Sequence, residues 1–397
     1  MSTDCPSSDA MSLTSGQPLA NTVVVSDIDR SSSLLIEWER LAGARLFLGP
    51  RWLLSWWDHF RQPGDQLHIV TVRDPDGWLI GLAPWYRRQT WWGGNEIQFL
   101  GSGEVCSDYL SILAKAGEET TVVRAVSNFV EEAMLGIDRF YLEGIEADDA
   151  VMRQFVAAMQ SLQFDVSQRE CLEGYRLELP TEWEGWLSQL SKSRRNRVRQ
   201  LWRNQFDTGV AKIHVADETT LDEGFAILVD LHQHRRNQLG QAGCFASTRF
   251  HDFLKQAAVE HLKAGQLRLQ WIELEGKPVA AELDLMEGDN YLHYCSGMAI
   301  DCEHARPGWL GVTAAIRYAI ESGRTNFDFL RGDEGYKSHW RGQPVAMINV
   351  ELVPPKFRAQ ARYRFRSMVD LAKQHAKRVL HRPAKSAQPA SGSSDHN

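Results

Sequence analysis

The order in which strand-like and helix-like segments follow one another is the feature that most constrains the fold of this chain. Two long stretches, 22–179 and 183–353, each contain a strand, two helices, three strands, a helix and a strand in that order. The stretches share this order but no sequence identity, so the repeat lies in the layout alone. Helices that alternate with groups of short strands predict an α/β (α+β) protein built from two like units.

Turn signals indicate that several neighbouring strands form hairpins. Asp74-Pro75-Asp76-Gly77 separates two strand-like runs in the first stretch, and Glu275-Gly276-Lys277 separates two in the second. Residues of these types favour tight turns, which join antiparallel strands. Further strand-like runs are expected at 96–100, 109–113, 139–142 and 291–298.

The composition divides the chain into five segments. The start is rich in Ser, Pro and Gly and has no apolar segment, which is typical of a disordered tail rather than of a secretory signal. Two α/β units of this size lie in the usual domain range. We therefore expect a disordered tail at 1–20, a first unit at 21–180, a second unit at 181–355, a basic amphipathic helix at 356–385 and a disordered tail at 386–397.

The charge is unevenly distributed. The chain carries −7 overall, from 44 basic and 51 acidic residues. The segment 356–385 holds ten Lys and Arg against one acid and carries +9, so the rest of the chain carries −16. An acidic body with a basic tail argues against a stable nucleic-acid complex. The tail helix is expected to dock on this acidic body, or alternatively to contact an anionic membrane surface.

Cysteine and histidine spacing gives no sign of a metal site. The six cysteines form no CxxC pair, which favours reduced thiols and a cytoplasmic protein. His232 and His234 lie two apart on an expected helix and so point to different faces. No apolar run approaches the length of about 18–20 residues that crosses a bilayer. We expect no metal and no membrane span.

Titratable residues are concentrated in one stretch, Phe327–Trp340. It begins as an apolar strand pattern and breaks at Gly332. Asp333, Glu334, Tyr336 and Lys337 then follow within a few residues. Such a cluster after a strand is either a solvated turn or a catalytic site at a sheet edge.

Two further motifs occur in the second stretch, 183–353. Arg306-Pro307-Gly308 opens a helix, and Ser191–Arg197 opens another with a run of basic residues. Together with Phe327–Trp340, these motifs resemble the BioF2-like, or CelD-like, acetyltransferases of the GNAT superfamily, which are related to the FemAB-type transferases. Gly81–Trp85 and Ser107-Asp108-Tyr109 are weaker echoes in the first half, and Gly335 departs from the pattern.

The resemblance implies two GNAT-like units, each a mixed, mostly antiparallel sheet flanked by helices. It also implies that acetyl-CoA, or another acyl-CoA, is the donor. The CoA pyrophosphate would meet the free N–H groups and the positive dipole end at the start of the second-unit helix. The candidate cofactor-binding residues are Arg306, Pro307, Gly308, Trp309 and Gly311, with Gly297 as the expected point where the preceding strand splays.

The same resemblance assigns candidate catalytic roles. Tyr336 would protonate the leaving thiolate, and Asp333 or Glu334 would act as the base. Lys337 would bind an anionic group of donor or acceptor. Asp328 and Arg331 are expected to form a structural ion pair or a rim, and Trp340 to pack. The basic helix, with Lys192, Arg194, Arg195, Arg197, Arg199 and Arg203, is either a solvated face or a phosphate-binding surface.

Three functions remain open at this point. The first is an N-acyltransferase that moves an acyl group from acyl-CoA to an amine or hydroxyl of a small molecule, sugar or envelope precursor. The second is a FemAB-type transfer from aminoacyl-tRNA. The third is a non-catalytic accessory factor in exopolysaccharide biosynthesis.

Overall fold

The computed structural model describes residues 20–91, 94–103, 107–302, 305–332 and 335–380. For Tyr336 and residues 370–380 it describes the backbone alone. The tails expected at 1–20 and 386–397 lie outside these residues, apart from Ala20.

The first half of the chain forms two sheets. The six-stranded sheet has the order β2-β5-β6-β8-β17-β9, and the four-stranded sheet has the order β1-β3-β4-β7. Every pair is antiparallel except β6 with β8. The strands are β1 Asn21–Val25, β2 Gln66–Leu67, β3 Ile69–Arg73, β4 Leu79–Ala83, β5 Trp85–Thr90, β6 Gly94–Phe99, β7 Leu113–Ala114, β8 Arg139–Glu146, β9 Asp165–Glu170 and β17 Met347–Val353. The helices are α1 Ser33–Ala42, α2 Pro50–Phe60, α3 Glu119–Ala133 and α4 Ala150–Ser161.

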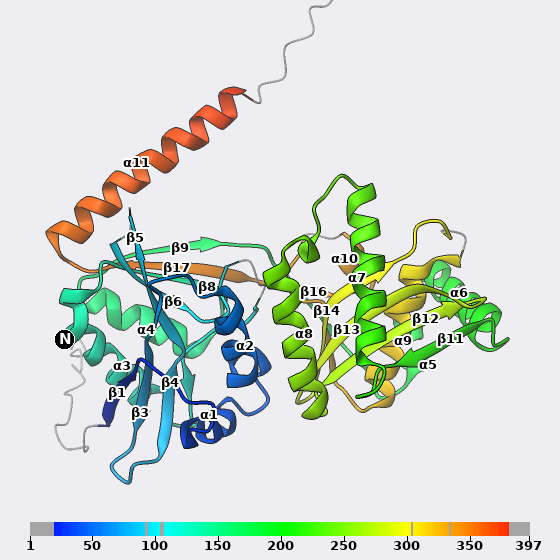
Figure 1. Ribbon diagram of the computed structural model, residues 1–397, viewed down its shortest axis with the longest axis horizontal. Helices are drawn as coiled ribbons and strands as arrows, with labels where there is room; N and C mark the ends of the chain where they lie inside the picture. Colours follow the sequence, from blue (N-terminus) through cyan, green and yellow to red (C-terminus); the bar gives the residue numbers. More distant parts are fainter. Residues whose placement is uncertain (1–19, 92–93, 104–106, 303–304, 333–334, 381–397) are drawn as a thin grey trace, which may run out of the picture.

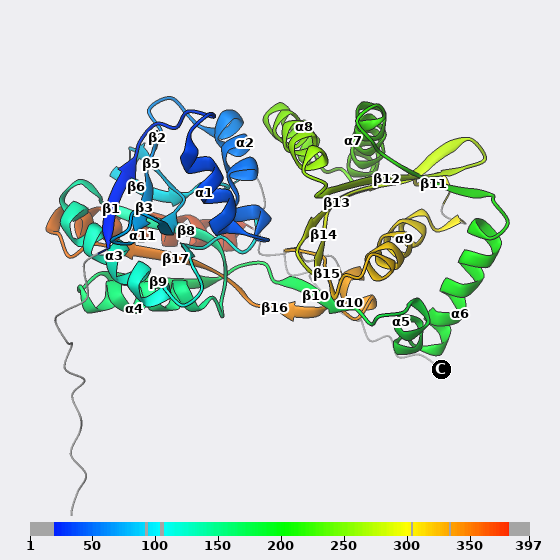
Figure 2. The same cartoon turned by 90° about the horizontal axis from the view of Figure 1, so that it is seen from below.

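The second half forms one seven-stranded sheet in the order β11-β12-β13-β14-β15-β10-β16. Only β14 and β15 pair in parallel. The strands are β10 Gly174–Glu178, β11 Ala211–Val215, β12 Leu267–Leu274, β13 Lys277–Glu287, β14 Asn290–Met298, β15 Asn326–Asp328 and β16 Gln343–Val345. The helices are α5 Trp183–Gln189, α6 Lys192–Leu201, α7 Leu221–Gln238, α8 Thr248–Lys263, α9 Pro307–Glu321 and α10 Tyr336–His339. Figure 2 shows α7 and α8 on one face of the sheet and α9 on the other. The mixed, mostly antiparallel α/β architecture predicted from the sequence is confirmed.

The two halves exchange strands. β10 precedes the expected boundary at residue 180 yet lies between β15 and β16 in the second sheet. β17 comes from the end of the second stretch yet pairs with β8 and β9 in the first sheet. Figure 2 shows both crossings between the halves. Each sheet is thus completed by a strand from the other part of the chain.

A shared core also joins the halves. Helix α2 packs on α8. The centroid of the Trp52 ring lies 4.9 Å from that of the Phe253 ring and 5.1 Å from that of the Tyr294 ring. Trp52 and Trp56 are buried, as their common helix face predicts, whereas Trp78 and Trp91 are exposed. The apolar surface between the halves therefore belongs to the core of the protein.

One predicted strand is absent. The run 109–113 was expected to be extended, but only Leu113–Ala114 pairs, as β7. Tyr109 has φ 59, in the left-handed region that breaks a strand. The side chains of Asp108 and Tyr109 contact the second half of the chain, and these contacts compensate for the unusual backbone.

Helix α11, Phe357–Leu380, extends from the body in Figure 1. Arg362 pairs with Asp138 at 2.7 Å, and Arg366 pairs with Glu96 at 3.2 Å. The first turns of this helix therefore dock on acidic groups of the body, as its charge predicts. Within residues 20–380, apart from the short gaps given above, no helix is both long and apolar enough to cross a membrane.

Candidate functional site

The parallel strands β14 and β15 part near the middle of the second sheet. They pair from Asn290 with Asn326 to Leu292 with Asp328, after which β15 ends and β14 continues to Met298. A register shift against β13 inserts Tyr294 into β14 at this level. Two cavities lie beside this opening, and Ser296 contributes to the wall of both.

The smaller cavity, which we call the α9 cavity, has a volume of about 200 Å³. Its walls come from β13, β14, the start of α9 and α10. Gly308 and Trp309 line it on one side, and His339 and Trp340 on another. The cavity thus lies beside the N-terminus of a 15-residue helix, which favours negatively charged groups.

The residues predicted to bind the donor at the start of α9 differ in their environments. Arg306 is the exposed N-cap of α9 with φ 53, and Pro307 is its buried first residue. A Cβ on Gly311 would come within 2.1 Å of the Glu282 Oε1 atom, so this glycine allows α9 to approach β13. Gly308 has more room, because the nearest atom to a Cβ there is the Met298 sulfur at 2.7 Å.

Gly297 has a packing role. A Cβ on Gly297 would come within 2.6 Å of the backbone nitrogen of His232 on α7. The sequence predicts that the strand splays at Gly297, but the β14–β15 pairing already ends at Leu292. The lack of a side chain at Gly297 brings α7 close to the sheet.

Basic side chains gather beside the α9 cavity. The guanidinium groups of Arg197 and Arg306 lie over the Trp309 ring, at 5.4 and 6.0 Å from its centroid. Arg194 donates a hydrogen bond of 2.7 Å to the His339 carbonyl. Helix α6 therefore brings part of its positive charge to the start of α9, which suits a phosphate ligand. Its Arg199 instead pairs with Glu184 on the surface.

The larger cavity, which we call the α7 cavity, has a volume of about 330 Å³. It lies between α7, the segment that follows α7, β14 and the segment after β15. Arg236, Arg331 and Lys337 line it together with His293. Three basic residues in the wall suit a binding site for an anionic or hydroxylated molecule.

Two buried acids and a histidine, which we call the acid–histidine network, contribute to the walls of both cavities. Asp284 on β13 bonds to His293 Nδ1 at 2.8 Å and accepts a bond of 2.7 Å from the Tyr291 hydroxyl. Glu282, which lines the α9 cavity, accepts a bond of 3.0 Å from Gln270. The ligand atoms of Glu282, Asp284 and His293 lie within 4.8 Å of one another. Because protein donors already bind both acids, we interpret this group as a proton network and not as a metal site.

The environment changes the protonation of this network. Burial raises the pKa of Glu282 to about 7 despite the opposing charge of His293. Burial lowers the pKa of His293, but Asp284 and Glu282 more than offset this, so the pKa is raised. His293 Nε2 has no hydrogen-bond partner among the described residues. His293 lines the α7 cavity, and an acid holds its Nδ1, which leaves Nε2 as the atom that can exchange a proton.

The acid–histidine network was not predicted from the sequence. Its signal is that Glu282 and Asp284 alternate within the otherwise apolar strand Ala280–Met286, which places both acids on one face. A buried strand with two acids on one face needs a polar partner nearby. His293 on the neighbouring strand supplies it.

The stretch Phe327–Trp340 holds its shape through internal contacts. Leu330 has φ 57, and its N–H donates to Asp328 Oδ1 at 2.8 Å. The buried Lys337 ammonium donates to the carbonyls of Leu330 and Arg331 at 3.1 and 2.9 Å. Lys337 therefore positions this turn and also lines the α7 cavity.

The two predicted catalytic acids, Asp333 and Glu334, lie outside the described residues. Tyr336 begins α10, but its side chain is not among those described. Trp340 is buried and packs against Trp186 and Trp309, as predicted.

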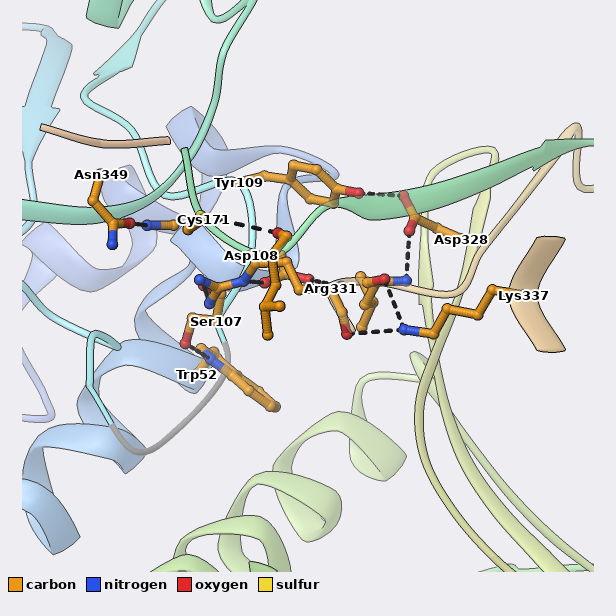
Figure 3. A network of polar contacts seen from close by, with 12 residues as sticks. Trp52, Ser107, Asp108, Tyr109, Cys171, Asp328, Arg331, Lys337 and Asn349 are labelled. Carbon is orange, nitrogen blue, oxygen red and sulfur yellow. Dashed lines mark hydrogen bonds and ion pairs between the residues drawn. The ribbon is translucent and has the colours of Figure 1, made fainter. Parts of the chain in front are cut away.

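Asp328 and Arg331 do not pair with each other, contrary to one of the predicted roles. Asp328 bonds to the Tyr109 hydroxyl at 2.7 Å and to Arg176 at 3.1 Å, and Arg331 binds Asp108 (Figure 3). The Arg331 N–H also donates to Asp108 at 2.7 Å. Asp328 and Arg331 lie at the turn that follows β15. This turn lies directly against Ser107–Tyr109, so both residues connect it to the first half of the chain.

Comparisons with known proteins find a similar domain sequence and similar folds. A model of the acetyltransferase (GNAT) domain matches residues 192–338. The crystal structure of FemX aligns with a TM-score of 0.55 over 75% of this chain and 90% of its own, at 12% identity. A conserved protein of unknown function from Bacteroides thetaiotaomicron aligns with a TM-score of 0.53 over 83% of this chain and 100% of its own, at 10% identity. At these identities the structures show the fold alone.

A search of curated proteins finds no match to the chain. The family model covers the second half, where the two cavities lie, and the structural likeness extends over both halves. Residues 192–338 thus match a GNAT acetyltransferase domain, and most of the chain shares the fold of FemX.

Proposed function

We propose that this protein transfers an acyl group from acyl-CoA, such as acetyl-CoA, to an amine or hydroxyl of a small molecule, sugar or envelope precursor. The observation that carries the proposal is the pair of cavities that share Ser296 where β14 and β15 part. A transferase must hold its two substrates in adjoining sites so that they can react, and the two adjoining cavities support this proposal.

The donor would occupy the α9 cavity. Its phosphates would meet the N-terminus of α9 and the guanidinium groups of Arg197 and Arg306, which lie over Trp309. Gly308 and Trp309 would border the acyl-bearing arm. The thioester would then lie near Ser296, where an acceptor in the α7 cavity can reach its carbonyl carbon.

The chemistry follows from this placement. The acceptor nitrogen attacks the thioester carbonyl, a C–N bond forms, and the C–S bond breaks. His293 Nε2 takes the proton that the acceptor loses, and the raised pKa of His293 makes it a better proton acceptor. Tyr336 returns a proton to the departing thiolate. Asp333 and Glu334 remain candidate bases, and Lys337 and Arg236 supply positive charge to an anionic acceptor.

Acetyl-CoA is expected to raise the melting temperature of the wild-type protein but not that of Gly308→Glu. The new side chain would lie against Met298 and bring a negative charge to the phosphate site. Thermal shift and calorimetric titration with acetyl-CoA and longer acyl-CoAs measure this. Gly136→Glu is the matched control, since a Cβ there meets no atom within 4 Å. Equal binding by both folded variants would remove the donor site, and a screen of amines with labelled acyl-CoA would identify the acceptor.

Tyr336→Phe is expected to lower turnover by about 10²-fold while donor affinity stays within about twofold, since only proton return to the thiolate is lost. Steady-state kinetics with the best amine acceptor test this, with Tyr141→Phe on β8 as control. Full turnover in Tyr336→Phe would exclude the tyrosine as the acid.

The FemX-like fold supports a second candidate, transfer from aminoacyl-tRNA. Stabilisation by charged tRNA but not by acyl-CoA would favour it, and stabilisation by neither would favour an accessory role in polysaccharide biosynthesis. The acidic body makes a stable nucleic-acid complex the weaker proposal.

We further propose that the enzyme acts in the cytoplasm, where acyl-CoA is available, and that α11 contacts an anionic membrane weakly. Phe365 and Met368 are exposed on this basic helix. Removal of 356–397 should then abolish co-sedimentation with anionic vesicles.

A further inference from the structure

Three potential metal ligands converge on the wall of the α7 cavity, apart from the acid–histidine network. His232 comes from α7, Cys244 from the segment after α7, and Cys295 from β14. Their ligand atoms all lie within 4.8 Å of one another. The Cys244 sulfur lies 3.5 Å from His232 Nε2.

The separation of Cys244 and His232 matches the geometry of a tetrahedral zinc ion. With Zn–S of about 2.3 Å and Zn–N of about 2.0–2.1 Å, a tetrahedron places sulfur and nitrogen about 3.6 Å apart and two sulfurs about 3.8 Å apart. The observed distance of 3.5 Å between Cys244 and His232 agrees with the first value. A metal could therefore bind with little movement of these side chains.

The imidazole of His232 is already oriented for such a role. Its Nδ1 lies 3.1 Å from the Gln233 side-chain oxygen, so Nδ1–H donates and Nε2 carries the lone pair toward Cys244. Gln233 is in turn held by a bond of 2.9 Å from its amide to the Ala242 carbonyl. The Phe245 ring packs edge-on at 5.1 Å from the imidazole. A hydrogen bond to the second nitrogen is the usual support of a metal-binding histidine.

We propose that His232, Cys244 and Cys295 bind a zinc ion. Two thiolates balance the charge of Zn²⁺, so the site would be neutral in this largely buried position. Because all three residues line the α7 cavity, the fourth coordination position faces that cavity. The site does not depend on acyl transfer, and its test requires no activity.

Zinc binding to the reduced, metal-free, full-length chain tests the proposal. Competition with a chromophoric chelator is expected to show one tightly bound Zn²⁺ per chain. Co²⁺ is expected to give the intense near-ultraviolet band of thiolate coordination. Less than about 0.2 Zn²⁺ per chain, or a Co²⁺ spectrum without that band, would overturn the proposal.

Matched cysteine variants locate the site. Cys244→Ser is expected to weaken zinc binding by more than about 100-fold, since even changes in supporting residues cost about 10–100-fold. Cys302→Ser, at another partly buried thiol, is expected to bind as the wild type does. Equal affinities of the two variants would refute the assignment. Should Cys244→Ser fail to fold, Gln233→Ala decides, with a loss of about 10–100-fold expected and unchanged affinity contradicting the site.

Discussion

Replacement of Arg331 by methionine is expected to lower the free energy of unfolding by about 3–5 kcal/mol, the usual cost of removing one partner of a buried ion pair. Asp108 is fully buried, and Arg331 binds it through both its side chain and its backbone N–H. Arg331 also donates a bond of 3.0 Å to the Ser107 carbonyl (Figure 3). Methionine preserves much of the volume but leaves the Asp108 carboxylate without its charge partner.

Urea unfolding measures this effect, and two further variants define its cause. Arg153→Met removes an ion pair with Asp148 in which both side chains are largely exposed, and it is expected to cost less than about 0.5 kcal/mol. Asp108→Asn combined with Arg331→Met is expected to recover part of the loss, because no buried charge then remains. Equal losses for Arg331→Met and Arg153→Met would contradict a buried electrostatic connection between the halves.

The pH dependence of Arg331→Met provides a second check. Burial already raises the pKa of Asp108, and Arg331 opposes that rise. Without Arg331, the folded-state pKa rises further above its unfolded value, so the folded state binds more protons. Stability is then lost as the pH rises through that pKa. The deficit of the variant against wild type should therefore be smaller at pH 5 than at pH 8.

Much of the fold could be predicted because its signals are local. The apolar spacing of 221–238 gives α7 with the bounds that the structure shows, and the turn at Glu275-Gly276 gives the β12–β13 hairpin. The strand exchange could not be predicted in this way. The alternation of residues 174–178 and 347–353 does not predict which sheet each strand joins. A strand pattern indicates which face is buried, but not which strands are its neighbours.

The candidate site, too, could be predicted only where its signals are local. The helix start at Pro307-Gly308 was predicted because a proline and a glycine before an apolar helix form a local signal. The roles of Arg194 and Arg197 depend on how α6 packs near Trp309, which residue types do not state. The cluster of His232, Cys244 and Cys295 has no motif spacing, because separate elements bring its members together.

Replacement of His293 by asparagine is expected to lower kcat by about 10²–10⁴-fold, the range that a positioned general base contributes. Asparagine can still donate to Asp284 from its amide, but it has no basic nitrogen in place of Nε2. Affinity for acetyl-CoA should stay within about twofold, since His293 lines the α7 cavity and not the α9 cavity. Steady-state kinetics and calorimetric titration of acetyl-CoA separate these two effects.

His261→Asn is the matched control for this variant. His261 is also buried, its Nδ1 also has a side-chain partner, Gln266 at 3.0 Å, and its Nε2 also lacks one among the described residues. It lines neither cavity, so its replacement should leave kcat within about threefold of wild type. A fall in kcat in both variants would point to general loss of packing. Normal turnover in His293→Asn would exclude His293 and transfer the role of base to Asp333 or Glu334. The two variants therefore distinguish a histidine that takes a proton from the second substrate from a histidine that only packs in the core.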